Sequence, residues 1–311
     1  MSVKNTLVLD EMPDLFWELV KENNNEKYFT TEKLLFSEEI EIIILRTKSI
    51  ITESHYKRFP NLKCIIRAGS GYDNIDVVKA VEYGITIQNT PEANVQSAFE
   101  HTLALIFSLI KNLKPHNNSV LLNTWREGIA DNLEVSDLKV LVVGIGRVGS
   151  KVAEYLKLLG AEVRFVDPYE DETFWEGQDI NSTSYQEGLQ WCNLVTYHCP
   201  LYAKTHHYFS KSELSLLTQP IYLINAARGE IVDVDAVVKG IQDNKIIGAG
   251  IDVMENEPWQ CEGWEASDRI ILTPHTGAFT AKAKQRLSEE CYSTWNEFCF
   301  NSKVVSQIKV W

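Results

Sequence analysis

Ten short apolar runs recur along the chain and predict ten β-strands. They are TLVLD at 6–10, EIIILRT at 41–47, KCIIRAG at 63–69, ITIQNT at 85–90, KVLVVG at 139–144, EVRFVD at 162–167, NLVTYHCP at 193–200, IYLINAAR at 221–228, IIGAGIDV at 246–253 and RIILTPH at 269–275. Most are apolar at nearly every position, which is typical of strands that a parallel sheet buries on both faces.

Apolar residues at helical spacing fill the intervals between these runs. One such stripe is Val148, Val152, Leu156 and Leu159, and another, in a final helix over about 281–299, is Leu287, Cys291, Trp295 and Phe298. A longer helix over 94–113 is expected to join the two halves of the chain. Because strands alternate with helices, the pattern predicts an α/β protein with parallel sheets.

Length and composition set outer limits on this picture. At 311 residues, the chain is long enough for two domains. The net charge of −13 argues against binding to nucleic acid or to an anionic membrane. The six cysteines show no metal-ligand spacing, so we expect reduced thiols, no metal site and a cytoplasmic protein. The N-terminus also lacks the residue order of a signal peptide.

Three glycines follow the strand predicted over 139–144. Gly144, Gly146 and Gly149, with Arg147 and Val148, form G-x-G-x-x-G at the start of a helix, which is the context of a dinucleotide-binding fingerprint. The first glycine permits a tight turn, the second lets the backbone approach a pyrophosphate, and the third lets helix pack on strand. The alternative is a tight strand-to-helix turn in a protein that binds no nucleotide.

Asp167 ends the next predicted strand, 18 residues after Gly149. A carboxylate there can accept hydrogen bonds from the adenosine ribose and repels a 2′-phosphate, and the residues that follow, Pro168 to Asp171, include no arginine. The sequence therefore predicts NAD as cofactor.

Three ionisable residues follow later predicted strands: Arg228 in NAARGEIVD, Glu257 in DVMENEP and His275 in LTPHTGA. In parallel α/β sheets the carboxyl ends of the strands border the ligand crevice. Each residue alone has an ordinary structural interpretation, as a solvated loop charge or as a histidine beside a turn.

Together with RAGSGYDNID at 67–76 and NTPEANVQSAFEHT at 89–102, these motifs resemble the D-isomer-specific 2-hydroxyacid dehydrogenase family. The resemblance implies two Rossmann-like domains with parallel sheets. A discontinuous substrate domain would take residues 1–95 and 281–311, and an inserted NAD-binding domain would take 96–280. It also implies that no regulatory domain follows residue 311.

The resemblance assigns roles residue by residue. The catalytic residues of the family fall on Arg228, Glu257 and His275, and its backbone cradle for the substrate carboxylate falls on Ser70 and Gly71. Beyond the glycine motif and Asp167, further cofactor contacts fall on Pro200, Thr205, Ala226 and Asp252. Phe99 and Ala278 depart from common family residues, but neither change removes a chemical group.

Chemistry supports these roles independently. Hydride transfer between nicotinamide and C2 of a 2-hydroxy acid requires a proton to enter or leave the C2 oxygen, which His275 can exchange near neutral pH. Glu257 would fix the imidazole ring, and Arg228 offers paired donors for a carboxylate.

The substrate is left open between two classes. RAGSGYDNID and Arg46, which stands where phosphoglycerate dehydrogenases place an arginine for the substrate phosphate, favour 3-phosphoglycerate and phosphohydroxypyruvate. A glyoxylate or hydroxypyruvate reductase is the alternative. A different class is an NAD(H)-sensing protein resembling the C-terminal-binding-protein corepressors. The resemblance also implies a homodimer or larger homo-oligomer.

Overall fold

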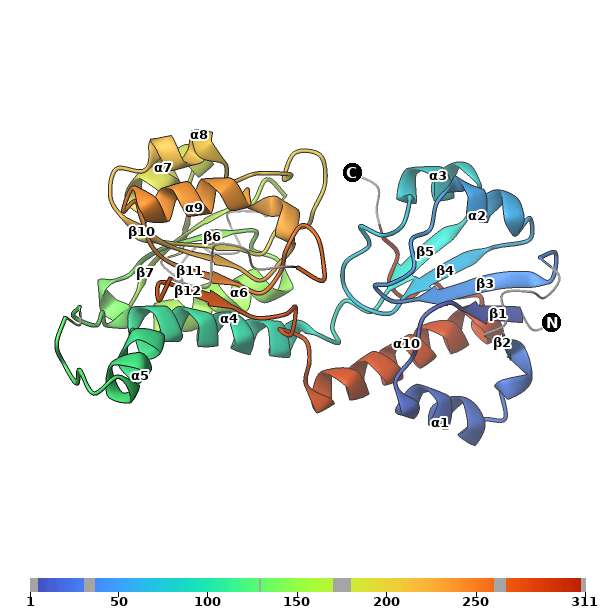
Figure 1. The fold of residues 1–311 in the computed structure, drawn as a ribbon. Helices are drawn as coiled ribbons and strands as arrows, with labels where there is room; N and C mark the ends of the chain where they lie inside the picture. Colours follow the sequence, from blue (N-terminus) through green and yellow to red (C-terminus); the bar gives the residue numbers. More distant parts are fainter. Residues whose placement is uncertain (1–4, 31–36, 129, 170–179, 260–266, 309–311) are drawn as a thin grey trace. The chain divides into compact units, whose positions relative to one another are not determined.

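The computed structural model describes all residues except 1–4, 31–36, 129, 170–179, 260–266 and 309–311 (Figure 1). The chain divides into two compact units. Unit 1 comprises Met1–Val95 and Phe279–Trp311, and unit 2 comprises Gln96–Ala278.

Unit 1 is built on a five-stranded parallel sheet in the order β2-β1-β3-β4-β5. Its strands are β1 (Asn5–Val8), β2 (Phe29–Thr30), β3 (Ile40–Leu45), β4 (Cys64–Arg67) and β5 (Thr86–Asn89). Helices α1 (Asp14–Glu22) and α10 (Ala281–Asn301) cover one face, and the short helices α2 (Glu53–Arg58) and α3 (Val77–Glu82) cover the other (Figure 1).

Alternate residues of β3 serve the two faces of this sheet. Ile42 and Ile44 belong to the core under α1 and α10, whereas Ile43 and Leu45 belong to the core under α2 and α3. Two-sided burial explains why the strands read as continuous apolar runs. Trp295 of α10 is fully buried, and its indole Nε1 donates a hydrogen bond to Thr6 Oγ1 at 2.8 Å.

Unit 2 contains a seven-stranded parallel sheet in the order β12-β11-β10-β9-β6-β7-β8. Its strands are β6 (Lys139–Val143), β7 (Glu162–Val166), β8 (Asn181–Ser182), β9 (Leu194–Tyr197), β10 (Ile221–Asn225), β11 (Ile246–Ile251) and β12 (Ile270–Leu272). Helices α4 (Val95–Ile110) and α6 (Arg147–Leu158) pack on one face. The other face carries α7 (Tyr185–Trp191), α8 (Lys211–Leu216) and α9 (Val234–Gln242). Helix α5 (Leu113–Leu121) follows α4.

The strand order of unit 2 reverses between β6 and β9. From β6 the chain moves outward to β7 and β8, and then returns to place β9 on the other side of β6. In open parallel sheets, ligands bind outside the carboxyl ends of the strands at such a reversal. The strand order therefore predicts that a ligand binds beside the loop that follows β6.

The predicted α/β fold with two parallel sheets is confirmed, and all ten predicted strands are present. The sequence missed the two-residue strands β2 and β8, which are too short to form a run. The helix expected over 94–113 ends at Ile110, because Asn112 adopts a left-handed backbone with φ of 47°. The helical stripe expected to reach Leu159 stops short of it, since α6 ends at Leu158 and Leu159 is exposed.

Across the described residues, no helix has the length and apolar character needed to cross a membrane. The five cysteines in this part of the chain are free, and Cys261 lies outside it.

Candidate functional site

The three glycines of unit 2 differ in what surrounds them. Gly144 has φ of +91°, and a Cβ there would lie 2.6 Å from the Cys199 amide nitrogen, at the carboxyl end of neighbouring β9. A Cβ on Gly149 would lie only 1.9 Å from the Gly144 carbonyl oxygen, so α6 packs directly on the turn. A Cβ on Gly146 would meet nothing within 4 Å. The loop is thus tight at its ends and open in its middle, as a pyrophosphate site requires.

The amino end of α6 presents backbone donors to this open middle. Gly146 is the N-cap residue, and no side chain caps the terminus. The first amides of a helix have no partner within the helix, and the helix dipole favours an anion beside them. The residues present therefore fit a dinucleotide phosphate.

Asp167 stands immediately after β7, beside the glycine loop. Its carboxylate accepts hydrogen bonds from the amides of Ile145 and Tyr169, both at 3.0 Å. These bonds hold the carboxylate at the strand end where the sequence predicted a ribose-binding acid. Glu170 and Asp171 lie outside the described residues.

Arg228 follows β10 in a turn that a buried asparagine organises. Asn225, which is 1% exposed, donates from Nδ2 to the Arg228 carbonyl oxygen at 2.7 Å and accepts from the Ala227 amide at 3.1 Å. The Arg228 guanidinium donates to the Ala227 carbonyl oxygen at 2.6 Å. The backbone of the arginine is therefore fixed at the carboxyl end of β10.

Glu257 and His275 are in direct contact. Nδ1 of His275 lies 2.8 Å from Oε2 of Glu257, while the other oxygen of Glu257 accepts the Met254 amide at 3.1 Å. Both side chains are about two-fifths exposed, at 41% for His275 and 38% for Glu257. Because the carboxylate engages Nδ1, Nε2 remains the nitrogen that can exchange a proton with a ligand.

The backbone of His275 is left-handed, with φ of 52°, which is uncommon for a residue that has a Cβ. Buried Asp252 holds this turn. Its carbonyl accepts the His275 amide at 2.7 Å, and its carboxylate accepts the amides of Thr276 and Gly277, both at 2.8 Å. A strained backbone at an exposed histidine is typical of a functional site whose surroundings enforce the conformation.

Burial alone would raise the pKa of Asp252. Hydrogen bonds from His101, Thr273 and the two amides outweigh that effect, so the pKa lies below its usual range. His101 Nε2 lies 2.9 Å from Thr273 Oγ1, which donates to Asp252 at 2.6 Å. The sequence had not singled out His101 or Thr273. Their only signal is that they lie inside the quoted motifs.

The other residues expected to contact cofactor lie at neighbouring strand ends. Pro200 follows β9 and is exposed, and Ala226 follows β10 and is partly buried. Thr205 is 4% exposed, and its hydroxyl donates to the Pro200 carbonyl oxygen at 2.7 Å and accepts the Tyr202 amide at 2.9 Å. The polar atoms of Thr205 and Asp252 form hydrogen bonds with neighbouring protein groups, so in this structure both residues stabilise loops.

Arg46, Ser70 and Gly71 lie in unit 1, after the adjacent strands β3 and β4. Asn89 donates to the Ser70 carbonyl oxygen at 2.8 Å and so fixes the loop. Within the part of the chain that the structure describes, the amides of Ser70 and Gly71 have no hydrogen-bond partner, so both can bind an anion. The Arg46 guanidinium donates to the Glu11 carbonyl oxygen at 3.0 Å.

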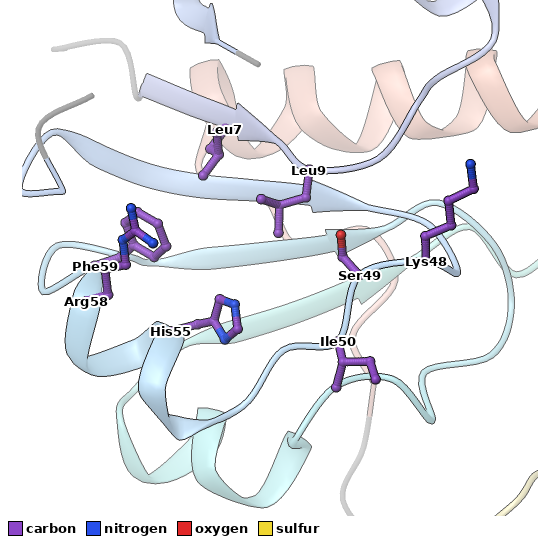
Figure 2. A pocket seen from close by; sticks show the side chains of 8 residues that line it. All are labelled: Leu7, Leu9, Lys48, Ser49, Ile50, His55, Arg58 and Phe59. Carbon is purple, nitrogen blue, oxygen red and sulfur yellow. The ribbon is translucent and has the colours of Figure 1, made fainter. Parts of the chain in front are cut away.

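A cavity of about 350 Å³ in unit 1 contains none of the predicted site residues (Figure 2). It is lined by Leu7, Leu9, Lys48, Ser49, Ile50, His55, Arg58 and Phe59. Figure 2 shows Arg58 and Lys48 at opposite ends, so these two cations do not converge on one ligand group. Ser49 Oγ donates to Asp10 at 2.6 Å. We assign no chemistry to this cavity.

Comparison with known proteins decides the family. Residues 103–277, more than half of the chain, match the NAD binding domain of D-isomer specific 2-hydroxyacid dehydrogenases. The chain belongs to this family. The matched domain contains the glycine loop, Asp167 and the strand ends that carry Arg228, Glu257 and His275, and its cofactor is NAD.

Relatives in this 2-hydroxyacid dehydrogenase family carry several substrate names. D-3-phosphoglycerate dehydrogenase of Bacillus subtilis (strain 168) is 30% identical over 268 residues, which are 86% of this chain and 51% of that protein. The chain thus spans about half the length of this relative. Hydroxypyruvate reductase of Thermotoga maritima is 29% identical over 86% of this chain and 90% of its own length. D-lactate dehydrogenase from Aquifex aeolicus, solved with NAD and lactic acid, is 28% identical with a TM-score of 0.85, over 94% and 95% of the two chains.

Proposed function

We propose that the protein is an NAD-dependent D-2-hydroxyacid dehydrogenase acting on the CH–OH group of its substrate. The observation that carries this proposal is the Glu257–His275 pair, with Arg228 on the strand next to that of Glu257. The order β12-β11-β10 puts the carboxyl ends of these three strands side by side, so an acid–base group and a cation for a carboxylate share one edge of the sheet.

NAD(H), when bound, supplies or accepts the hydride at C2 of the substrate. His275 gives a proton to the C2 oxygen from Nε2 during reduction and takes it back during oxidation. Glu257 holds Nδ1 and so keeps Nε2 oriented. Arg228 binds the substrate carboxylate and polarises the neighbouring oxygen. In unit 1, we propose an anion-binding role for the Ser70 and Gly71 amides, which have no hydrogen-bond partner among the described residues.

For the substrate, we propose 3-phosphoglycerate and phosphohydroxypyruvate, with Arg46 binding the phosphate. Support comes from the position of Arg46 after β3 and from the phosphoglycerate dehydrogenase relatives. A second candidate is hydroxypyruvate or glyoxylate reduction. It is favoured by the Thermotoga maritima relative, a hydroxypyruvate reductase that is 29% identical over 86% of this chain.

Arg46→Ala separates these candidates. Losing a charge-assisted pair to a phosphate costs about 2 to 5 kcal/mol, which is at least about 30-fold in kcat/KM for phosphohydroxypyruvate. Unphosphorylated hydroxypyruvate should be affected little, and Arg58→Ala, which changes an exposed arginine of α2, should affect neither substrate. A wild-type enzyme without preference for the phosphorylated acid would assign the chain to the second candidate.

The corepressor-like alternative is tested by measuring the reduction of four 2-oxo acids together with the binding of peptides. Peptide binding that depends on NADH, with no turnover of phosphohydroxypyruvate, hydroxypyruvate, glyoxylate or pyruvate, would support it instead.

We also propose a homodimer formed through unit 2, in the cytoplasm. The carboxyl end of α5 and the turn after it expose Val120, Leu121, Leu122 and Trp125, by 55% to 71% of their surfaces. Large apolar side chains that are exposed close together in the chain are typical of an interaction surface. Light scattering should find a dimer, and Leu121→Glu with Leu122→Glu should give a monomer.

A further inference from the structure

Three segments of unit 2 meet at His207. Its amide donates to the Glu230 carbonyl oxygen at 2.7 Å, next to the Arg228 turn. Its imidazole Nε2 lies 2.5 Å from Oε1 of Glu255, in the segment that leads to Glu257. One residue thus contacts the two segments that carry proposed catalytic groups.

These two segments also contact each other closely. A Cβ on Gly229 would lie 2.0 Å from the Met254 carbonyl carbon and 2.3 Å from the Glu255 nitrogen. Met254 in turn donates its amide to Glu257 Oε1. Glu255, Met254, Glu257 and the His275 ring thus form one continuous series of neighbouring groups.

His207 occupies its place at a conformational cost. Its φ is 48°, in the left-handed region that favours glycine. The His207 and Glu255 side chains are 36% and 34% exposed, and ion pairs near the surface add little to stability. A glycine would suit this backbone better, so stability does not explain a histidine here.

We propose that His207 is a positioning residue: by binding Glu255, it fixes the segment that carries Glu257 against the segment that carries Arg228. This inference rests on the proposed dehydrogenase function. It predicts that losing the His207 side chain misplaces the proton-transfer group without weakening the fold. Misplacement of about 1 Å at a reacting centre costs up to about 100-fold in rate.

The first experiment compares His207→Gly with His206→Ala. Glycine removes the side chain and suits the positive φ, so the melting temperature should stay equal or rise. We expect kcat with the preferred 2-oxo acid to fall about 10- to 100-fold, while the dissociation constant of NADH changes less than about 2-fold, a split that distinguishes positioning from cofactor binding. His206, an exposed neighbour whose ring stacks on His207, should be replaceable without loss. Wild-type kcat in His207→Gly, or a fall in kcat that only tracks lower stability, would overturn the proposal.

The second experiment tests the partner. Glu255→Gln keeps an acceptor of the same length and should retain most of kcat, whereas Glu255→Ala should match His207→Gly. Equal losses in the two Glu255 variants would contradict the positioning role.

A third measurement does not depend on turnover. In ¹⁵N NMR spectra, the ring resonances of His275 should shift in His207→Gly and stay in place in His206→Ala. If the wild-type protein reduces no 2-oxo acid, the dehydrogenase proposal fails, and this spectrum still decides whether His207 positions the Glu257–His275 pair. Unchanged His275 resonances would reject it.

Discussion

Replacing Gly149 and Gly146 by alanine, one at a time, tests the glycine loop most directly. Each change adds the same methyl group, three residues apart. The Cβ of Gly149→Ala would lie 1.9 Å from the Gly144 carbonyl oxygen, and real Cβ atoms essentially never approach within 3.0 Å, so α6 must move back by about 1 Å or more. Overpacking of this kind costs about 1 to 3 kcal/mol.

Gly146→Ala is the matched control for the fold. Its Cβ meets nothing within 4 Å and its φ is not positive, so the melting temperature should change by less than about 2 °C. The same methyl enters the space where the backbone is proposed to approach the pyrophosphate. NADH affinity should therefore fall about 10-fold or more.

Two assays separate the effects. Scanning calorimetry should show a loss of about 2 to 12 °C for Gly149→Ala, and fluorescence titration should show weaker NADH binding for both variants. A wild-type melting temperature in Gly149→Ala would refute the argument from close packing. A wild-type NADH affinity in Gly146→Ala would refute the placement of the pyrophosphate at this helix end.

Three further predictions concern single side chains. His275→Ala should lower kcat by about 100- to 10,000-fold with little change in NADH binding, measured by steady-state kinetics and titration; a small loss would remove His275 from proton transfer. Asp167→Ala should narrow the preference for NADH over NADPH, mainly through KM, and a wild-type enzyme that uses NADPH equally well would contradict the role of Asp167. Burial lowers the pKa of His198 from 6.5 to about 4, so between those values the unfolded state binds a proton that the native state does not, and stability rises with pH. Urea titrations measure the increase in unfolding free energy from pH 4.5 to pH 7. In His198→Gln this increase should be about 2 kcal/mol smaller than in the wild type. An unchanged increase would show that His198 is not the group responsible.

The fold was predictable because its signals are local. Each long strand is an apolar run buried on both faces. The glycines that follow β6 indicate a tight turn in which the backbone must adopt a conformation or a close approach that other residues do not allow. The strands β2 and β8 were not predictable, because two residues carry no period and their pairing depends on distant neighbours. The end of helix α6 was not predictable either, because the apolar residues at helical spacing continue to Leu159 although the helix ends at Leu158.

The candidate site also contains residues that local motifs indicate and residues that they do not. The proposed catalytic residues Arg228, Glu257 and His275 were proposed from the sequence because each follows a predicted strand in a recognisable motif. The residues that hold them were not. Asn225, His101 and Thr273 act through contacts made in three dimensions, and His207 does so through a left-handed backbone that no local pattern announces.

The two stretches that build unit 1 have a consequence for how the chain folds during synthesis. Helix α10 supplies Leu287, Cys291, Trp295 and Phe298 to the core that β1, β3 and β4 share with α1. When residue 95 leaves the ribosome, that side of the sheet still lacks a helix made almost 200 residues later. Unit 2, whose sequence is continuous, can close its core first. Domains generally fold as units in the order in which they are synthesised, but here the amino-terminal segment must wait for its partner with an apolar face uncovered, the kind of species that aggregates and engages chaperones.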